Sequence, residues 1–166
     1  MIWLPFLCFN FPVNLFTSPR NSVTKLVLGF SYSSVAEHHE EVIIPAKISA
    51  DDAAGEIFKR ENMIRTERAD GNVTLDVTTL LSSDKKFSSG MYSSGKTRSE
   101  ITGAYGVDEF MFFLSGGVTL TSSDGTVTTI NAGEGVTIPK EWTGIWDTDG
   151  YTKIWVIYSA DGSAFE

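Results

Sequence analysis

The sequence predicts an all-β fold in which short antiparallel strands form a barrel or a sandwich. From about residue 22 onward, short runs rich in Val, Ile, Thr and aromatic residues are separated by Gly, Ser, Asp and Pro. Many such runs at similar spacing are typical of barrels and sandwiches and not of alternating β/α units. The chain has 166 residues, 42% of them hydrophobic, which suits one domain with a single buried core.

The individual strands follow from these runs, each of which ends where turn-forming residues begin. We expect strands at Thr24–Phe30, Glu41–Lys47, Val73–Leu81, Lys86–Ser93, Glu109–Leu114, Val118–Thr121, Thr126–Ile130, Val136–Ile138 and Thr152–Tyr158. One short helix is expected before the barrel, at Ala50–Lys59. Ser49 or Asp51 would cap it, because their side chains accept hydrogen bonds from the first helical amides.

The clearest turn signal is the pair Asp124-Gly125, between the β-branched runs Val118–Thr121 and Thr126–Ile130. Asp and Gly adopt the positive φ angles that a tight turn between antiparallel strands demands. The sequence therefore predicts a β-hairpin at this point.

Residues 1–22 are predicted to form an apolar leader, and residues 23–166 a single β-barrel domain. Met1–Phe16 is mostly apolar, but Pro and Asn interrupt it, and it is too short for a membrane span. It also lacks the basic start and the small residues of a secretory signal. The leader is then either poorly ordered, an artefact of start-site choice, or a strand that covers an edge or a partner subunit.

The charge of the chain limits its partners. Thirteen basic and twenty-one acidic residues give a net charge of −8, which repels nucleic acid and anionic membranes. The one cysteine, Cys8, cannot form an internal disulfide, so nothing points to an oxidising compartment. We therefore expect a cytoplasmic protein without a nucleic-acid or membrane partner.

Two spacings in the last third of the chain point to a known superfamily. Glu109 is followed after six residues by Gly116, and Gly133 is followed after five residues by Pro139. Gly116 lies where one strand has to bend into the next, which favours a residue without a Cβ atom. With the hairpin between them, these spacings resemble the two motifs of the cupin superfamily. The resemblance covers the chain from near Phe87 onward and implies a jelly-roll β-barrel.

Within that superfamily the chain is similar to short cupins of the (S)-ureidoglycine aminohydrolase and ethanolamine-utilisation type. In those proteins tryptophans lie near the second motif and a lysine on the last strand, and Trp142, Trp146 and Lys153 match this pattern. The resemblance implies a small-molecule site inside the barrel.

The metal-binding histidines of the superfamily are missing. The positions of the His-x-His pair before Glu109 hold Gly103 and Tyr105, or Thr102 and Ala104 in the alternative spacing. The position of the third histidine is Gly144. A transition ion needs three or four converging ligands, and one carboxylate is not enough. We therefore expect no metal and no other cofactor.

The charged site residues are expected to be Glu109, Lys153 and Arg98. Inside the barrel the carboxyl group of Glu109 would be partly desolvated, so its proton affinity should rise unless a cation compensates it. Lys153 or Arg98 could supply that cation. Glu109 and Lys153 are the candidate catalytic residues and Arg98 a candidate ligand-binding residue. The alternative is that Glu109 lies on the rim in an ordinary surface pair.

Four aromatic residues are candidates for the wall of the binding site, namely Tyr92, Tyr105, Trp142 and Trp146. Their rings would give a flat apolar surface, and their indole and phenol groups would provide polar contacts. The alternative is that they belong to the core or to a dimer interface, which are also rich in such residues.

Two further features carry little functional weight. His38 and His39 are adjacent, so on an extended strand their rings point to opposite faces and do not converge on a metal. Cys8 has no neighbouring base in the sequence, so a nucleophilic role has no support.

Three functions remain open. The first is the binding of a small polar metabolite in a metal-free barrel of a dimeric protein. The second is an enzyme of the (S)-ureidoglycine aminohydrolase kind, acting on a ureido compound or an amino acid. The third is a non-catalytic dimeric scaffold or regulatory module, since an apolar sheet face could be covered by a second copy. That face would contain Phe110, Phe112, Ile154 and Val156.

Overall fold

The computed structural model describes residues 43–165. The leader at 1–22, the boundary at residue 23, the strand expected at Thr24–Phe30 and the pair His38-His39 lie outside the described residues. The fold below concerns the compact unit that contains residues 46–165.

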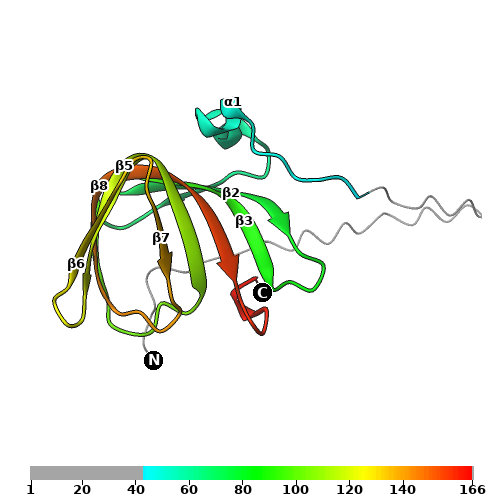
Figure 1. Ribbon diagram of the computed structural model, residues 1–166. Coiled ribbons are helices and arrows are strands. Elements are labelled where there is room, and N and C mark those ends of the chain that lie inside the picture. The colour runs from blue at the N-terminus through cyan, green and yellow to red at the C-terminus, as the bar shows by residue number, and fades with distance from the viewer. Residues whose placement is uncertain (1–42, 166) are drawn as a thin grey trace, which may run out of the picture. The chain divides into compact units, whose positions relative to one another are not determined.

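This unit is an antiparallel β-barrel of the jelly-roll kind, as the sequence predicts (Figure 1). Its strands are β1 (Ile64–Glu67), β2 (Val73–Leu81), β3 (Phe87–Ser94), β4 (Thr97–Ile101), β5 (Asp108–Ser122), β6 (Val127–Asn131), β7 (Gly135–Ile138) and β8 (Gly144–Tyr158). They form one sheet in the order β1-β2-β3-β8-β5-β6, while β4 pairs with β8 and β7 pairs with β5.

The two long strands β5 and β8 pair along most of their length and form the centre of the barrel. Each has different neighbours at its two ends: β5 pairs first with β7 and then with β6, and β8 pairs first with β4 and then with β3. The pairing register shifts between Phe113 and Ser115 and again between Gly117 and Thr119. Such bulges bend a sheet strongly, which lets one pair of strands serve both sides of the barrel.

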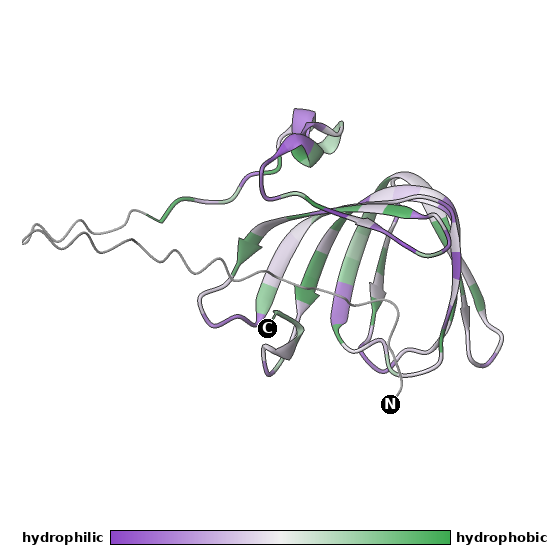
Figure 2. Cartoon of the chain, turned by 180° about the vertical axis from the view of Figure 1, so that it is seen from behind, coloured by the Kyte–Doolittle hydropathy of each residue, from purple (hydrophilic) through white to green (hydrophobic). Residues whose placement is uncertain are grey.

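The residues of the long strands alternate between an inner and an outer face. On β8 the inward residues Tyr151, Lys153, Trp155 and Ile157 are buried, and Tyr158 faces outward. Figure 2 shows that hydrophobic and hydrophilic residues both occur along the strands. The inner face forms the main core, which also includes Met111 and Phe113 of β5.

A second, smaller core lies on the outer face of the sheet. Ile57 packs there against Val77 of β2 and Met91 of β3, and all three side chains are fully buried. Ile57 comes from the helical segment before β1, which lies outside the curve of the sheet in Figure 1. This segment therefore covers part of the outer face.

The helix expected at Ala50–Lys59 is shorter than predicted. The α-helix α1 covers Ala50–Ala53, and a 3-10 helix, η1, covers Glu56–Lys59. Gly55 separates them with a φ of 115°, a left-handed conformation that ends α-helical geometry. Ser49 caps α1 as expected, since its side chain accepts a hydrogen bond from the Asp52 amide.

Four predictions about the strands need correction. Residues 43–47 of the expected strand Glu41–Lys47 are not in a strand. The strands expected at Glu109–Leu114 and Val118–Thr121 are one continuous strand, β5, and β8 begins at Gly144 and not at Thr152. Both differences have the same cause, because glycines and bulges bend these strands without ending them. Strands β1 and β4 were not predicted.

The hairpin at Asp124-Gly125 is confirmed. It joins β5 to β6, and Gly125 has a φ of 86°. The side chain of Asp124 accepts a hydrogen bond from the Thr126 amide at 2.9 Å, which stabilises the turn.

Among residues 43–165, no helix has the length and apolar character that crossing a membrane requires.

Candidate functional site

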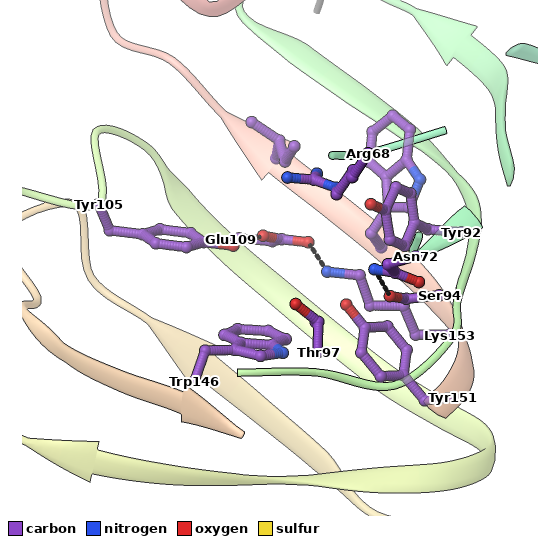
Figure 3. Close-up of a pocket in the computed structure, with 12 residues that line it drawn as sticks. Arg68, Asn72, Tyr92, Ser94, Thr97, Tyr105, Glu109, Trp146, Tyr151 and Lys153 are labelled. Carbon is purple, nitrogen blue, oxygen red and sulfur yellow. Dashed lines mark hydrogen bonds and ion pairs between the residues drawn. The ribbon is translucent and has the colours of Figure 1, made fainter. Parts of the chain in front are cut away.

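A partly enclosed pocket lies inside the barrel, with a cavity volume of about 60 Å³ (Figure 3). This volume suits a few water molecules or the polar group of a small ligand. Strands β3, β4, β5 and β8 provide most of its wall, and the β1–β2 and β4–β5 connections provide the remainder. Five of the residues predicted for the site line it: Glu109, Lys153, Tyr92, Tyr105 and Trp146.

The centre of the pocket is a buried ion pair between Glu109 of β5 and Lys153 of β8. Their side chains are 5% and 7% exposed, and Lys153 Nζ lies 2.6 Å from Glu109 Oε1. The hydroxyl group of Tyr105 donates a hydrogen bond to the other oxygen, Glu109 Oε2. Both carboxylate oxygens therefore have a partner, and the cation that the sequence analysis called for is Lys153.

The alternation of β5 and β8 explains why these two residues meet. Glu109 pairs with Ile157, and Lys153 pairs with Phe113, so both side chains belong to the inward face of neighbouring strands. Lys153 is also opposite Tyr92 of β3. The ion pair thus joins the two long strands across the interior of the barrel.

Aromatic rings surround the ammonium group of Lys153. Its Nζ lies 5.5 Å from the ring centre of Trp146, 5.6 Å from that of Tyr92 and 5.9 Å from that of Tyr151. It also contacts Met111 Sδ at 2.8 Å. Faces of aromatic rings attract cations, so these rings provide favourable contacts for the ammonium group in a largely desolvated place.

Asp76 adds a second carboxyl group behind Lys153. In the register of β2, β3 and β8, Asp76 is opposite Tyr92, which is opposite Lys153. Burial raises the pKa of Asp76 to about 6, although a hydrogen bond from Trp155 Nε1 at 3.2 Å and the charge of Lys153 act in the opposite direction. Asp76 therefore titrates close to neutral pH.

The two buried tyrosines of the site stay protonated at neutral pH. Burial raises the pKa of Tyr105 well above its ordinary value, and the negative charge of Glu109 adds to this effect. Burial also raises the pKa of Tyr151. Tyr105 is therefore a hydrogen-bond donor to Glu109 over the physiological pH range.

Two predicted site residues lie outside the lining of the pocket. Arg98 of β4 is largely exposed and forms an ion pair with Asp147. Trp142 packs edge to face against Tyr105, with ring centres 6.3 Å apart, and its Nε1 donates to Ser122 Oγ at 3.1 Å. Trp142 thus supports the position of Tyr105 from behind.

Seven lining residues were not named from the sequence: Arg68, Asn72, Ser94, Thr97, Tyr151, Trp155 and Ile157. Three of them, Tyr151, Trp155 and Ile157, alternate with Lys153 along β8, so the inward face of this strand could have indicated them. Arg68 and Asn72 lie in a connection, where no periodic pattern marks the direction of a side chain.

The residues of this pocket do not fit a transition metal ion. Within residues 43–165, no group of three or more His, Cys, Asp or Glu side chains is arranged to hold a metal. At the expected histidine positions, Tyr105 instead binds Glu109 through its phenol, and Gly103 and Gly144 have no donor side chain. Lys153 and Tyr105 already donate hydrogen bonds to the carboxylate of Glu109. The three side chains therefore form a cluster of proton-carrying groups and not a set of metal ligands.

A bent antiparallel barrel with a polar pocket on its inner face is typical of the cupin fold. Comparison with family models agrees with this fold, because residues 81–153 match the model of the EutQ-like cupin domain. The particular likeness to (S)-ureidoglycine aminohydrolase stays a prediction. A search of curated protein sequences finds no match to this chain.

Solved structures with a similar fold come from several bacteria. A protein of unknown function from Pseudomonas syringae pv. tomato has 16% sequence identity and a TM-score of 0.52, over 57% of this chain and 43% of that one. The ectoine synthase of P. lautus has 16% identity and a TM-score of 0.50, over 65% and 77%. The EutQ protein of Clostridium difficile has 17% identity and a TM-score of 0.47, over 60% and 97%. At these identities the likeness concerns the fold alone.

Proposed function

We propose that the protein binds a small polar molecule in the barrel pocket around Glu109 and Lys153, without a histidine-based metal site. The observation that carries this proposal is the ion pair itself, which is buried yet lines a cavity. Removing two charges from water costs several kcal/mol per ion before their attraction offsets it. Apolar residues would fill a purely structural core at lower cost, so a charged pair beside a cavity favours a role in recognition.

The polar lining supports the same proposal. Arg68, Thr97 and Tyr151 contribute a guanidinium and two hydroxyl groups, while the rings of Tyr92 and Trp146 form apolar walls. A small number of polar groups on a mostly aromatic surface is the usual composition of a small-molecule site. The cavity volume of about 60 Å³ limits the inserted part of the ligand to a small group.

A metabolite screen by isothermal calorimetry tests the proposal, with Glu109→Gln and Lys153→Met as the site variants. A ligand of the pocket should bind the wild type and lose at least about tenfold in affinity in either variant, because a charged hydrogen bond contributes roughly 1.5–3 kcal/mol. Lys96→Gln is the control, since Lys96 is exposed and pairs with Asp149. Equal affinity in all proteins would contradict the proposal. Stoichiometric Mn, Fe or Zn in protein purified without chelators would contradict its metal-free part.

The second candidate is an enzyme of the aminohydrolase kind, which acts on a ureido compound or an amino acid. The contact between Glu109, Lys153 and Tyr105 favours it, because these three groups could exchange protons with a bound substrate. In this scheme Glu109 is the base. Ammonia release from ureido and amino-acid substrates should then be at least about a hundredfold slower in Glu109→Gln than in the wild type. Equal rates would remove Glu109 from the mechanism.

A further inference from the structure

Two buried polar atoms of residues that line the pocket, Asn72 Oδ1 and Trp146 Nε1, lack a hydrogen-bond partner among the described residues. The donor, Trp146 Nε1, is the one considered below. Trp146 is 2% exposed, and its indole Nε1 makes no hydrogen bond to any described residue. Buried polar groups are nearly always hydrogen-bonded, so an unpaired one calls for an explanation. The other two described tryptophans have partners, since Trp142 donates to Ser122 and Trp155 donates to Asp76. Trp146 is the exception, and it lines the pocket.

The direction of this N–H group identifies the kind of atom that would pair with it. Figure 3 shows the indole nitrogen of Trp146 turned into the pocket, toward Thr97 and Tyr151. An indole N–H is only a donor, so its partner has to be an acceptor. The ammonium group of Lys153 lies 5.5 Å from the centre of the same ring and is also only a donor. This part of the pocket thus offers donors to an oxygen atom of the ligand.

The charges of the site favour a neutral oxygen over a carboxylate. The charge of Lys153 is already compensated by Glu109 at 2.6 Å, and Asp76 lies behind Lys153 as a further acid. A carboxylate ligand would bring another negative charge close to Glu109 in a weakly solvated place. Arg68 also lines the pocket, and Figure 3 places it across the pocket from Trp146, beyond the ion pair.

We infer that the ligand of this pocket presents a neutral carbonyl oxygen, as in an amide, a ketone or an aldehyde, to the indole N–H of Trp146. The inference rests on the proposed function and adds the chemical class of the ligand. The carbonyl oxygen accepts the hydrogen bond that Trp146 lacks, and the adjacent rings of Tyr151 and Trp146 contact the carbon skeleton. The small cavity allows one such group to enter.

Titration of the full-length protein, followed by ¹H–¹⁵N NMR of the tryptophan side chains, tests the inference. The probes are acetamide, acetone and acetate at matched ionic strength; acetone lacks an N–H donor, and acetate has the shape of acetamide with a negative charge. The indole signals are assigned through their backbone correlations, so no variant is required. Acetamide and acetone should move the Trp146 N–H signal downfield in a saturable way. Acetate should bind at least about tenfold more weakly. The signal of Trp142 serves as the internal control, because its N–H group is already bonded to Ser122 and it lies outside the lining of the pocket.

The possible failures separate this inference from the proposed function. If acetate moves the Trp146 signal as strongly as acetamide, the neutral class is wrong and binding in the pocket stands. If the probes move signals of Tyr92 and Ile157 but not that of Trp146, the assignment to its N–H group is wrong and binding again stands. If no pocket signal responds to any probe, and the metabolite screen finds no ligand, both the inference and the proposed function are overturned.

Discussion

Glu109 and Lys153 each provide the main electrostatic compensation for the other. Both are buried, and the salt bridge between them joins the two longest strands of the barrel. The pair lines the polar pocket, and the main core of apolar and aromatic side chains lies around it. The two residues therefore contribute to stability in a way that depends on both being present.

We predict that Lys153→Met destabilises the protein by about 3–5 kcal/mol, because it leaves the carboxylate of Glu109 buried without its cation. The double variant Lys153→Met with Glu109→Gln should recover much of that loss, since a neutral amide keeps the hydrogen bond from Tyr105. Urea unfolding at pH 7 measures both. If the stability changes of Lys153→Met and Glu109→Gln, measured separately, add up to that of the double variant, the two side chains are not coupled.

Asp76 provides a prediction about pH. Burial raises its pKa from 3.8 to about 6, so between pH 4 and 6 the folded protein holds a proton that the unfolded chain has lost. The free energy of unfolding then falls by about 3 kcal/mol as the pH rises through this window. Above the window it is constant.

The variant Asp76→Asn should remove this fall, because the asparagine oxygen still accepts the hydrogen bond from Trp155 and has no charge to bury. The measurement is the difference between the stabilities of wild type and variant, taken by urea unfolding from pH 4 to pH 7. The wild type should lose stability relative to the variant as the pH rises. A constant difference, or one of opposite sign, would refute the role assigned to Asp76.

The motif position of Glu109, and the resemblance of Lys153 to the lysine on the last strand of short cupins, were enough to name two residues that line the pocket. They were not enough for Arg98, because β4 was not recognised as a strand and its outward face was therefore unknown. Trp142 and Trp146 looked equivalent in the sequence, yet Trp146 lies on β8 facing inward and Trp142 precedes that strand. Spacing alone does not distinguish a residue that lines a site from one that packs behind it.

Glycines shape the bends and crossings of the barrel. Gly116 has a φ of 65°, and a Cβ atom on it would lie 1.9 Å from the carbonyl oxygen of Gly150, so only glycine lets β5 and β8 approach there. Gly90 of β3 leaves space for a side chain, because a Cβ atom on it would lie 2.6 Å from the ring of Trp155. The indole of Trp155 thus lies across β3, where it reaches Asp76.

We predict that Gly90→Ala destabilises the protein by about 1–3 kcal/mol, because the added methyl group overlaps Trp155 and the carbonyl oxygen of Val77. Gly103→Ala is a matched control, since nothing lies within 4 Å of the position its Cβ atom would occupy. Urea unfolding of both variants decides the question. Equal stabilities would mean that Trp155 moves aside at no cost.

Most strands of the barrel were predictable, because they contain β-branched or aromatic runs that end at turn residues. Strands β1 (Ile64–Glu67) and β4 (Thr97–Ile101) were missed for a physical reason. All residues of β1 are exposed, and every residue of β4 except Ile101 is polar. Neither strand therefore contains an apolar run. Their extended form comes from pairing with β2 and β8, which is long-range information that local composition lacks.

At the scale of the whole barrel, the described residues cover its outer face only in part. The segment with η1 covers β2 and β3 around Met91, but Phe87, Phe110, Phe112 and Tyr158 remain 36–49% exposed. These four residues come from neighbouring strands, because β3 and β5 both pair with β8. A cluster of exposed aromatic side chains on one sheet face is typical of an interaction surface.

The homodimer expected from the sequence provides the simplest occupant of this face, since a twofold axis places the same apolar patch against itself. Light scattering over a range of concentrations should then give twice the chain mass for the wild type. The double substitution Phe110→Lys and Phe112→Lys should give the single mass, because it sets like charges against each other at the interface.

Val127→Lys provides the matched control for that experiment. Val127 is 60% exposed, but it lies on β6, which pairs with β5 beyond the bend and away from Phe110 and Phe112. It should leave the dimer intact, because an isolated exposed apolar residue does not form a patch. A wild type that stays monomeric at every concentration would reject the dimer. A dimer that survives both lysines on β5 but not the one on β6 would place the interface on the hairpin side of the barrel.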